Sequence, residues 1–540
     1  MTAINKRQIL KNVGSTWFSL GCDVLVGLFL SPIILHWLGD TAFGIWVLIF
    51  SITGYYGLFD LGIRSSVVRY VSKFTATDNI EELAKIVNTA LFTYSCLGVI
   101  SLALTGILSI YIEHIFKIPP ELHSEARWLL LIVGLAVGIG FPMGVVGGYL
   151  DGLQRFYVNN WANISGDFLR LGFILLAIHH KRGLLTIAAI TVAAPLFTSL
   201  MRSFAAYRIK PVPLGLKYVN RATLRTIVNY SSVTLLIMIA TQLKFKSDNV
   251  VIATMISAAA VTYFSIGARI VNYAQQVVMA LAQNFLPIAS QSEATGNMDR
   301  LRKVFVAGNR FCAFTALPIT SVLLVLGQSV IEVWVGKKYV ATSYPILVIL
   351  ILSANLMWCQ AASGRVLFGI SKHRTWAFVT LGEGIVNLLL SITLVHYFQR
   401  LPQNHVLYFG PNNGIYGDAL GTAIPLFCTM TMFMPWHLCR QLGIRMSTYL
   451  REAYALPLLI TAPLVGALLL MRRWFHPHNY KQLAVQMAIA GVVYGLGVLW
   501  IFLTKRAFKV GDLEPKETSV TISDDINSRP AIEAYQEEGS

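Results

Sequence analysis

Charged residues are scarce in this chain of 540 residues. They make up 13% of it, whereas a soluble domain carries about 25%. Apolar and aromatic residues of the AVILMFWYC set account for 55%, and the mean hydropathy is +0.61. Water therefore cannot be the solvent for most of the surface. This excludes the series of three or four soluble domains that the length alone would suggest.

Motifs for metal, cofactor or catalytic chemistry are also missing from the sequence. It holds no Walker GxxxxGK[ST], HExxH, GxSxG or EF-hand pattern. The six cysteines include no CxxC pair, and all fall in or beside apolar runs, which is typical of inert core thiols. We therefore expect no catalytic residue, no cofactor and no metal site, and the chain is not predicted to be an enzyme.

Long apolar runs are what the chain has instead. A helix needs about 20 mostly apolar residues to cross the hydrocarbon core of a bilayer. Fourteen stretches reach that length: 13–38, 43–71, 87–112, 127–150, 159–179, 184–206, 226–253, 258–282, 304–331, 345–369, 376–398, 415–438, 454–471 and 483–504. The sequence therefore predicts an all-α polytopic membrane protein with about 14 transmembrane helices.

The basic excess fits the same picture. Lysine and arginine number 43 against 26 aspartates and glutamates, a net charge of +17. The basic residues are scattered singly and in pairs between apolar runs, so no nucleic-acid partner is expected. With the N-terminus in the cytoplasm, about 27 of the 43 fall in cytoplasmic segments and about 10 in external ones. The positive-inside rule then predicts a multi-pass membrane protein with both termini cytoplasmic.

A weak internal repeat divides the chain. Residues 38–46 resemble residues 256–264, and each segment joins two long helices through a tight external turn of small residues. Six spans separate the copies, so both have the same orientation and would be related by an axis along the membrane normal. The alternative is that any two membrane hairpins look this similar. The repeat predicts two six-helix lobes related by pseudo-two-fold symmetry, at 1–207 and 226–440.

Three further segments complete the predicted organisation. Residues 208–225 form a basic cytoplasmic linker, and residues 441–508 form two additional C-terminal helices. Residues 509–540 hold eight acidic residues against three basic ones. Such a stretch cannot bury enough apolar surface to order itself, so we expect a disordered acidic cytoplasmic tail. No external loop exceeds about 20 residues, which leaves no room for an extramembrane catalytic domain.

Several short segments carry a family resemblance. They are Asn12-Val13-Gly14, Leu38-Gly39, Phe43-Gly44-Ile45-Trp46, Gly57-Leu58-Phe59-Asp60-Leu61-Gly62, Arg69-Tyr70, Asp248-Asn249, Tyr263-Phe264-Ser265 and Arg269-Ile270. Together they resemble the polysaccharide transporter family, the Wzx-like oligosaccharide flippases of the multidrug/oligosaccharidyl-lipid/polysaccharide exporter superfamily. The resemblance covers residues 5–505 and is not specific for a substrate. It implies a bacterial cytoplasmic membrane protein whose two lobes face each other as a V around a central cavity. It also implies export of undecaprenyl-diphosphate-linked sugar units.

Charged side chains within the spans are the candidates for function. Each costs at least roughly 2.5 to 3.5 kcal/mol at mid-bilayer, so each should face protein or water and have a partner. Three pairs have the spacing that places opposite charges on one helical face: Asp60 with Arg64, Asp167 with Arg170, and Lys244 with Asp248. Either the members of a pair neutralise each other structurally, or they act in transport. In the second case Arg64 and Lys244 bind substrate, and Asp60 and Asp248 bind a coupling ion.

Two basic residues have no acidic residue three or four positions away. Arg269 falls near mid-bilayer, and Lys246 also lacks such a neighbour. Cations of this kind suit a diphosphate or an acidic sugar, because arginine presents a planar fork to phosphate oxygens. We therefore predict that both bind substrate; the alternative for Arg269 is a long-range ion pair with Asp23 or Asp248.

Asp23 is isolated near the middle of the first span and is the preferred carboxylate for binding a coupling proton or sodium ion. A hydrogen-bonded structural aspartate is the alternative. Arg310, Arg365 and Glu383 lie near predicted cytoplasmic ends, where a side chain that extends to the membrane surface explains its charge.

Together with the basic residues in the spans, the family resemblance implies a flippase that moves a lipid-linked oligosaccharide by alternating access around a basic cavity. An ion-coupled exporter of small amphipathic cations with the same fold is the first alternative. A membrane glycosyltransferase, polymerase or ligase is the second, and the short external loops argue against it. For the flippase, the expected partners are the lipid-linked substrate, membrane lipids, a polysaccharide polymerase and glycosyltransferases.

Overall fold

The computed structural model describes residues 6–370, 373–406, 408, 410, 412–475, 477 and 479–504. Their regular structure is helical, which confirms the all-α prediction, and no strand occurs among them. The elements, with α marking α-helices and η short 3₁₀ or π segments, are α1 (Lys6–Gly54), η1 (Tyr55–Asp60), α2 (Ile63–Ala76), α3 (Ile80–Ile115), η2 (Pro120–Leu122), α4 (His123–Gly152), α5 (Phe156–His179), α6 (Leu184–Ile209), η3 (Leu216–Tyr218), α7 (Arg221–Met255), α8 (Ala258–Ala282), α9 (Phe285–Ala294), α10 (Met298–Val335), η4 (Lys337–Tyr339), α11 (Val340–Cys359), α12 (Ala361–Gly369), α13 (His373–Gln399), α14 (Gly414–Cys428), η5 (Thr429–Phe433), α15 (Met434–Leu442), α16 (Met446–Trp474) and α17 (Tyr480–Leu503). The predicted acidic tail lies outside the described residues.

Eleven helical segments within the described residues are long and apolar enough to cross a membrane, so the chain is a multi-pass membrane protein. One of these segments, Lys11–Asp60, is a single helical stretch that contains the first predicted span and most of the second. The backbone leaves helical geometry inside it at Gly39, where φ is 77° and ψ is 172°. Glycine adopts this conformation without a side-chain clash, and it ends the first span at the turn that the repeat predicts. The total of fourteen spans stays a prediction.

Three predicted spans are interrupted along their length. The second span passes from α1 through η1 into α2, and the breaks at Leu61 and Gly62 have positive φ angles of 49° and 73°. The tenth divides into α11 and α12, and the twelfth passes through the π-helical segment η5, whereas the eighth coincides with α8 and is followed by the short helix α9. Irregular backbone inside a membrane is tolerated where protein or a water-filled cavity satisfies it, so these breaks mark positions where polar chemistry is possible.

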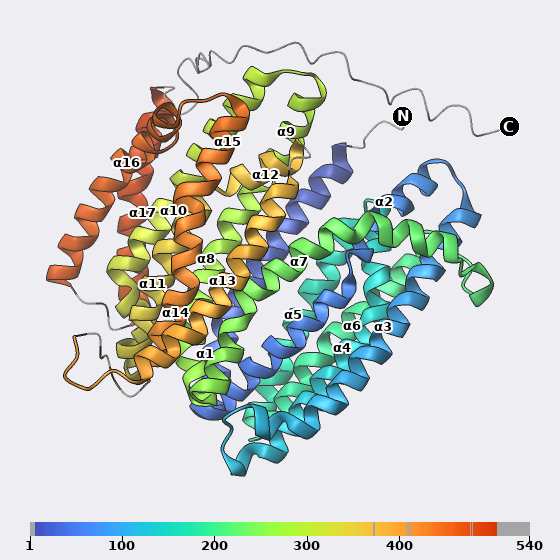
Figure 1. Cartoon of the computed structure of the whole chain (residues 1–540), viewed down its shortest axis with the longest axis horizontal. Helices are drawn as coiled ribbons and strands as arrows, with labels where there is room; N and C mark the ends of the chain where they lie inside the picture. Colours follow the sequence, from blue (N-terminus) through green and yellow to red (C-terminus); the bar gives the residue numbers. More distant parts are fainter. Residues whose placement is uncertain are drawn as a thin grey trace.

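The two halves of the chain lie side by side, with α1 and α7 running between them (Figure 1). The largest apolar core includes residues of both halves, among them Leu35, Ile45, Val261 and Ile346. Two smaller cores belong mainly to one half each. One joins α2, α3 and α4, and the other joins α10, α12, α15 and α16. The halves therefore share a core toward one end of the bundle and have separate cores toward the other. The lobe boundaries at 207 and 226 stay a prediction.

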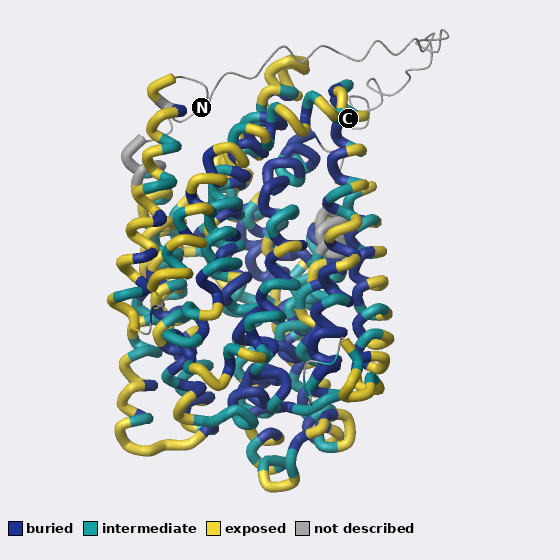
Figure 2. Tube along the Cα trace, turned by 90° about the vertical axis from the view of Figure 1, so that its left-hand side faces the viewer, coloured by how far each residue is buried: buried dark blue, intermediate teal, exposed yellow. Residues whose placement is uncertain are grey.

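We call the end with the shared core the far end, because it lies opposite the start of α1 (Figure 1). The charge pattern predicts that it faces outward from the cell. The two last helices pack on the second half: α16 contacts α10, and α17 contacts α16 and α10. Buried residues run through the centre of the molecule and exposed ones along its flanks (Figure 2), as a bilayer solvent allows for apolar side chains such as Ile110 and Leu496.

Candidate functional site

A cavity of about 950 Å³ lies among α1, α4, α5 and α6 in the first half of the chain. Its lining is largely apolar but includes three aspartates and three arginines: Asp23, Asp60, Asp167, Arg64, Arg170 and Arg202. The tertiary structure thus gathers charges from four predicted spans around one space. An apolar pocket with a few convergent charged groups is the usual form of a small-molecule or headgroup site.

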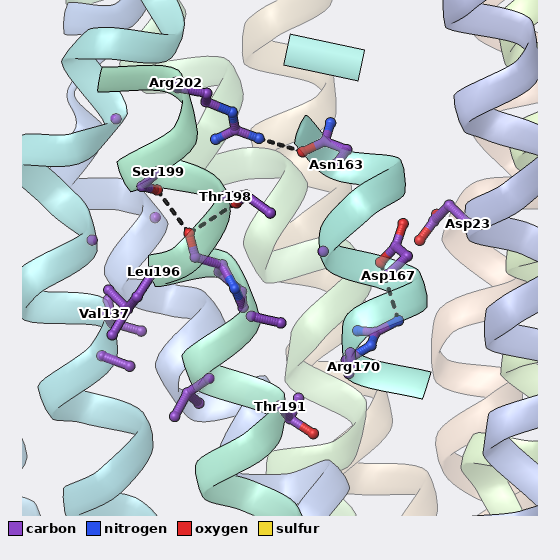
Figure 3. A pocket seen from close by; sticks show the side chains of 18 of the residues that line it. Asp23, Val137, Asn163, Asp167, Arg170, Thr191, Leu196, Thr198, Ser199 and Arg202 are labelled. Carbon is purple, nitrogen blue, oxygen red and sulfur yellow. Dashed lines mark hydrogen bonds and ion pairs between the residues drawn. The ribbon is translucent and has the colours of Figure 1, made fainter. Parts of the chain in front are cut away.

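Asp23 lies beside a second carboxylate. Its side chain and that of Asp167 extend toward each other in Figure 3, and the two charges repel electrostatically. Asp167 also pairs with Arg170, with 3.4 Å between Oδ1 and Nη2, as the i,i+3 spacing predicts. The expectation that Asp23 is isolated is therefore wrong, because α5 packs against α1 and supplies the neighbour. Asp23 is exposed within the cavity rather than buried.

The predicted pairing of Asp60 with Arg64 is also wrong. The Arg64 guanidinium reaches α4, where Nη2 lies 2.9 Å from Asp151 Oδ2. Only the backbone N–H of Arg64 donates to Asp60, at 3.3 Å, and the Asp60 carboxylate accepts the hydroxyl of Tyr94. Asn159 Nδ2 completes the arrangement by donating to Asp151 at 2.7 Å. The Arg64 side chain remains 54% exposed, so it can still bind an anion in the cavity.

Glycines in α4 leave space for the Arg64 side chain to lie against this helix and reach Asp151. A Cβ on Gly148 would lie 3.3 Å from Arg64 Cγ, and one on Gly147 would lie 3.7 Å from its Nη2. Gly134 and Gly138 instead contact Thr105 and Leu102 of α3, which confirms close helix packing at that end of α4. The glycine-rich sequence therefore has two roles, helix packing and space for an arginine.

Arg202 is a cavity residue that the sequence did not single out; it lies on α6, within the sixth predicted span. Its guanidinium donates to Asn163 of α5 (Figure 3), and its buried Nε has no hydrogen-bond partner among the described residues. Arg64 repels it and Asp151 attracts it, so the two arginines and one aspartate lie in one electrostatic group. This group carries a net positive charge on the cavity wall.

The two predicted unpaired cations, Arg269 and Lys246, lie near each other. Arg269 donates to Ser31 Oγ of α1, and its guanidinium lies 5.6 Å from the centre of the Phe43 ring. Lys246 repels Arg269 electrostatically, and Arg269 in turn repels Arg170. Neither Arg269 nor Lys246 forms an ion pair with a described residue, so the alternative pairing of Arg269 with Asp23 or Asp248 is excluded. The charge of Arg269 thus acts on both Lys246 of α7 and Arg170 of α5, and we call these three cations the cation cluster.

Lys244 is buried elsewhere and is not part of this cluster. Its Nζ pairs with Oε1 of Glu383 on α13, and the two side chains are 4% and 1% exposed. The i,i+4 pairing with Asp248 is therefore wrong, and so is the membrane-surface explanation for Glu383. The buried ion pair keeps Lys244 away from the cavity in this structure, and a substrate-binding role for Lys244 stays a prediction. Arg310 is likewise buried, and its Nη2 lies 3.0 Å from Glu452 Oε2.

Asp248 faces a carboxylate that sequence reasoning missed. It accepts a hydrogen bond from Thr422 of α14 at 2.9 Å, and its charge repels that of Asp418, one turn earlier on the same helix. Both aspartates are buried, with exposed fractions of 7% and 0%. Among the described residues, the carboxylate oxygens of Asp418 have at most the nearby Ser391 hydroxyl as a hydrogen-bond donor. Two buried carboxylates with so few donors form a site that a proton or a small cation would stabilise.

Comparison with known proteins identifies the family. The profile of the family described as "Polysaccharide biosynthesis protein" matches residues 9–293, more than half of the chain. The chain belongs to this family. The resemblance to Wzx-like polysaccharide transporters is thereby confirmed, and two relatives are similar to most of this chain. One, from Shigella flexneri, is described as an O-antigen transporter and is 19% identical over 73% of this chain and 93% of its own length. The other is the uncharacterized membrane protein EpsK of Bacillus subtilis, 20% identical over 79% and 83% of the two chains.

Solved structures share the fold of this family member. The lipid II flippase MurJ in an inward closed conformation superposes with a TM-score of 0.69 at 15% identity, over 92% of this chain and all of MurJ. A multidrug transporter of the MATE family in an inward-facing conformation has a TM-score of 0.63 at 15% identity, over 79% and 94%. The fold is thus that of the superfamily named in the sequence resemblance.

Proposed function

We propose that the protein flips a lipid-linked oligosaccharide, carried on undecaprenyl diphosphate, from the cytoplasmic to the outer leaflet by alternating access. Its family, its O-antigen transporter relative and its MurJ-like fold support this class of transport. The chain then acts as a transporter rather than an enzyme. Its partners are the lipid-linked substrate and membrane lipids, with a polymerase and glycosyltransferases acting beside it. In this proposal it lies in the bacterial inner membrane with both termini cytoplasmic.

The cation cluster is the observation that carries the proposal. Arg170, Lys246 and Arg269 come from three helices, and only Arg170 has an ion-pair partner among the described residues. Holding cations together in the interior of a membrane protein is unfavourable unless an anion joins them. A diphosphate carries several negative oxygens and would neutralise more than one of these cations at once.

Deletion and replacement of the gene test the transport direction. Loss of the protein should cause lipid-linked glycan to accumulate on the cytoplasmic side, measured by its protection from a membrane-impermeant periodate-type oxidant in right-side-out vesicles. Expression of the intact chain should restore accessibility. Unchanged glycan lipids together with altered drug sensitivity would instead support a multidrug exporter. The cation cluster argues against that alternative, because it would repel cationic drugs.

We further propose that Asp248 and Asp418 bind the coupling cation. Asp248, but not Asp418, is one of the predicted ion-binding carboxylates; Asp23 and Asp60 are the others. The contacts favour Asp248, because Asp60 already accepts Tyr94 and Asp23 is exposed beside Arg170 and Asp167. A cation bound at the buried pair would be given up only when the helices around it move, which is what coupling to a conformational change requires.

A further inference from the structure

One carboxylate at the far end joins the two halves of the chain. Asp40 begins the second segment of α1, directly after the turn at Gly39. Its Oδ1 accepts the Tyr339 hydroxyl at 2.5 Å, and its Oδ2 accepts the Tyr263 hydroxyl at 3.0 Å. Lys338 Nζ lies 3.0 Å from Oδ1 and 3.3 Å from Oδ2. Three donors therefore converge on one side chain.

All three donors belong to the second half of the chain. Tyr263 lies on α8, whereas Lys338 and Tyr339 form η4 between α10 and α11. The backbone adds a further bond, since Thr262 Oγ1 donates to the carbonyl oxygen of Asp40 at 2.6 Å. The contact joins the two copies of the internal repeat, because Asp40 belongs to the first copy and Thr262 and Tyr263 to the second. We call Asp40 and these four partners the far-end latch.

The backbones around the latch approach closely. A Cβ on Gly44 would lie 1.9 Å from the carbonyl oxygen of Ala258, so the second segment of α1 rests directly on the start of α8. Trp334 Nε1 donates to the Leu28 carbonyl at 2.7 Å, which ties α10 to the first segment of α1. The Lys117 backbone N–H donates to the Ala253 carbonyl at 3.0 Å and ties the loop after α3 to α7. The halves are thus in contact at several separate points besides the Asp40 side chain.

The latch differs from these packing contacts in its chemistry. The Asp40 side chain is 22% exposed and that of Lys338 is 60% exposed, so water can replace the partners when they separate. When such a carboxylate exchanges its protein donors for water, it avoids most of the desolvation cost of a buried, unpaired charge. A bond of this kind is suited to repeated opening and closing, whereas Gly44 and Ala258 set how closely the halves can approach.

We propose that Asp40 is the gate carboxylate of the far end. Tyr263, Lys338 and Tyr339 hold it while the cavity opens at the end where α1 begins, and their release allows the cavity to open at the far end. The proposal rests on the alternating access of the proposed function. It goes beyond that function by assigning the closed state of one face to the side chains of Asp40, Thr262, Tyr263, Lys338 and Tyr339.

A cysteine in the cavity reports on this gate. Gly140 lines the cavity, and no atom lies within 4 Å of the Cβ that a substitution would add, so Gly140→Cys has room for its side chain. The full-length protein in right-side-out membrane vesicles is treated with a membrane-impermeant maleimide. Labelling of the same chain without Gly140→Cys is subtracted, because Cys96 and Cys428 are exposed. The rate of labelling then measures how often the far end opens.

We expect Asp40→Asn and Lys338→Gln each to raise this rate at least about tenfold, because each removes charge-assisted bonds from the closed state. Lys337→Gln is the matched control: Lys337 is exposed and adjacent, and its side chain makes no hydrogen bond or ion pair with the described residues. It should leave the rate at that of the parent. Lys338→Gln changes an exposed side chain, so the test does not depend on whether Asp40→Asn folds.

Labelling by Lys338→Gln at the parent rate, or an equal rise with Lys337→Gln, overturns the latch. The assay needs no substrate, which separates it from the proposed function. If the glycan-lipid test fails while the latch variants still raise labelling, the flippase assignment falls and the gate stands. If export is restored but labelling never changes, the gate falls and the flippase stands.

Discussion

Lys244 and Glu383 form an ion pair in the interior of the second half, where both side chains are almost fully buried. Asn387 Nδ2 donates to the Lys244 carbonyl at 3.1 Å, so α13 is bound to α7 by both backbone and charge. The pair occupies the helix face that the sequence assigns to Lys244 and Asp248. Because Lys244 pairs with Glu383, it does not neutralise Asp248, which lies near Asp418 of α14 instead. Asp248 and Asp418 are the two carboxylates for which we propose a coupling role.

Breaking this ion pair should destabilise the protein. Removing one partner of a buried pair costs about 3 to 5 kcal/mol, because the other charge stays buried alone, whereas replacing both by apolar residues is often neutral. We expect Lys244→Met and Glu383→Leu each to lower the thermal midpoint of the detergent-purified protein, and the double variant to recover most of it. Additive losses in the double variant would show that the two charges act independently.

Arg269→Ala should reduce export without loss of folded protein. Its guanidinium contacts Ser31 and the face of Phe43, and it lies in the cation cluster, so we expect at least about a tenfold fall in glycan-lipid translocation. Arg269→Lys should recover only part of it, because lysine keeps the charge but not the planar fork. Arg225→Ala, at the exposed start of α7, is the control. Equal effects of the two alanine variants would remove Arg269 from the substrate site.

Asp248→Asn and Asp418→Asn should each abolish gradient-dependent transport while the protein remains in the membrane. Each keeps the side-chain shape but removes a charge from the proposed cation site. The readout is glycan-lipid translocation into vesicles with and without an imposed proton or sodium gradient. Asp23→Asn serves as the comparison and should retain measurable gradient dependence. Loss of coupling only in Asp23→Asn would return the ion site to the first span, where the sequence places it.

Gly148→Ala should impair transport by displacing Arg64. The new methyl group would lie 3.3 Å from Arg64 Cγ, closer than ordinary van der Waals contact, and would push the guanidinium away from Asp151. We expect a several-fold loss of export with protein levels unchanged. Gly144→Ala on the same helix is the matched control, because nothing lies within 4 Å of its new Cβ. The displacement argument fails if Gly144→Ala is as harmful as Gly148→Ala.

Local patterns predicted the parts of the site that depend on one helix. The Asp167–Arg170 pair follows from the i,i+3 spacing, and the turn at Gly39 follows from small residues between two apolar runs. Arg269 and Lys246 were identified because no acidic residue stands one turn away on their own helices. Such inferences succeed when the relevant neighbour lies within four residues, since helical geometry then sets the distance.

Contacts between helices account for what the sequence did not predict. Arg64 prefers Asp151 on α4 to Asp60 on its own span, because Gly147 and Gly148 leave space for it and Asn159 orients the aspartate. Asp418 was missed because no oppositely charged residue lies one helical turn away from it in the sequence. Its importance depends on Asp248 lying across the interface between α7 and α14.

The sequence alone determined that this is an all-helical membrane protein, because the length and composition of an apolar run are enough to predict a helix in a bilayer. Its family could also be identified from short segments around the turns and breaks. The tertiary structure alone decided which charges are neutralised and which face a cavity or the far end. Inside a membrane every charge needs a partner or water, and whether it finds one depends on which helices pack together rather than on its own neighbours in the chain.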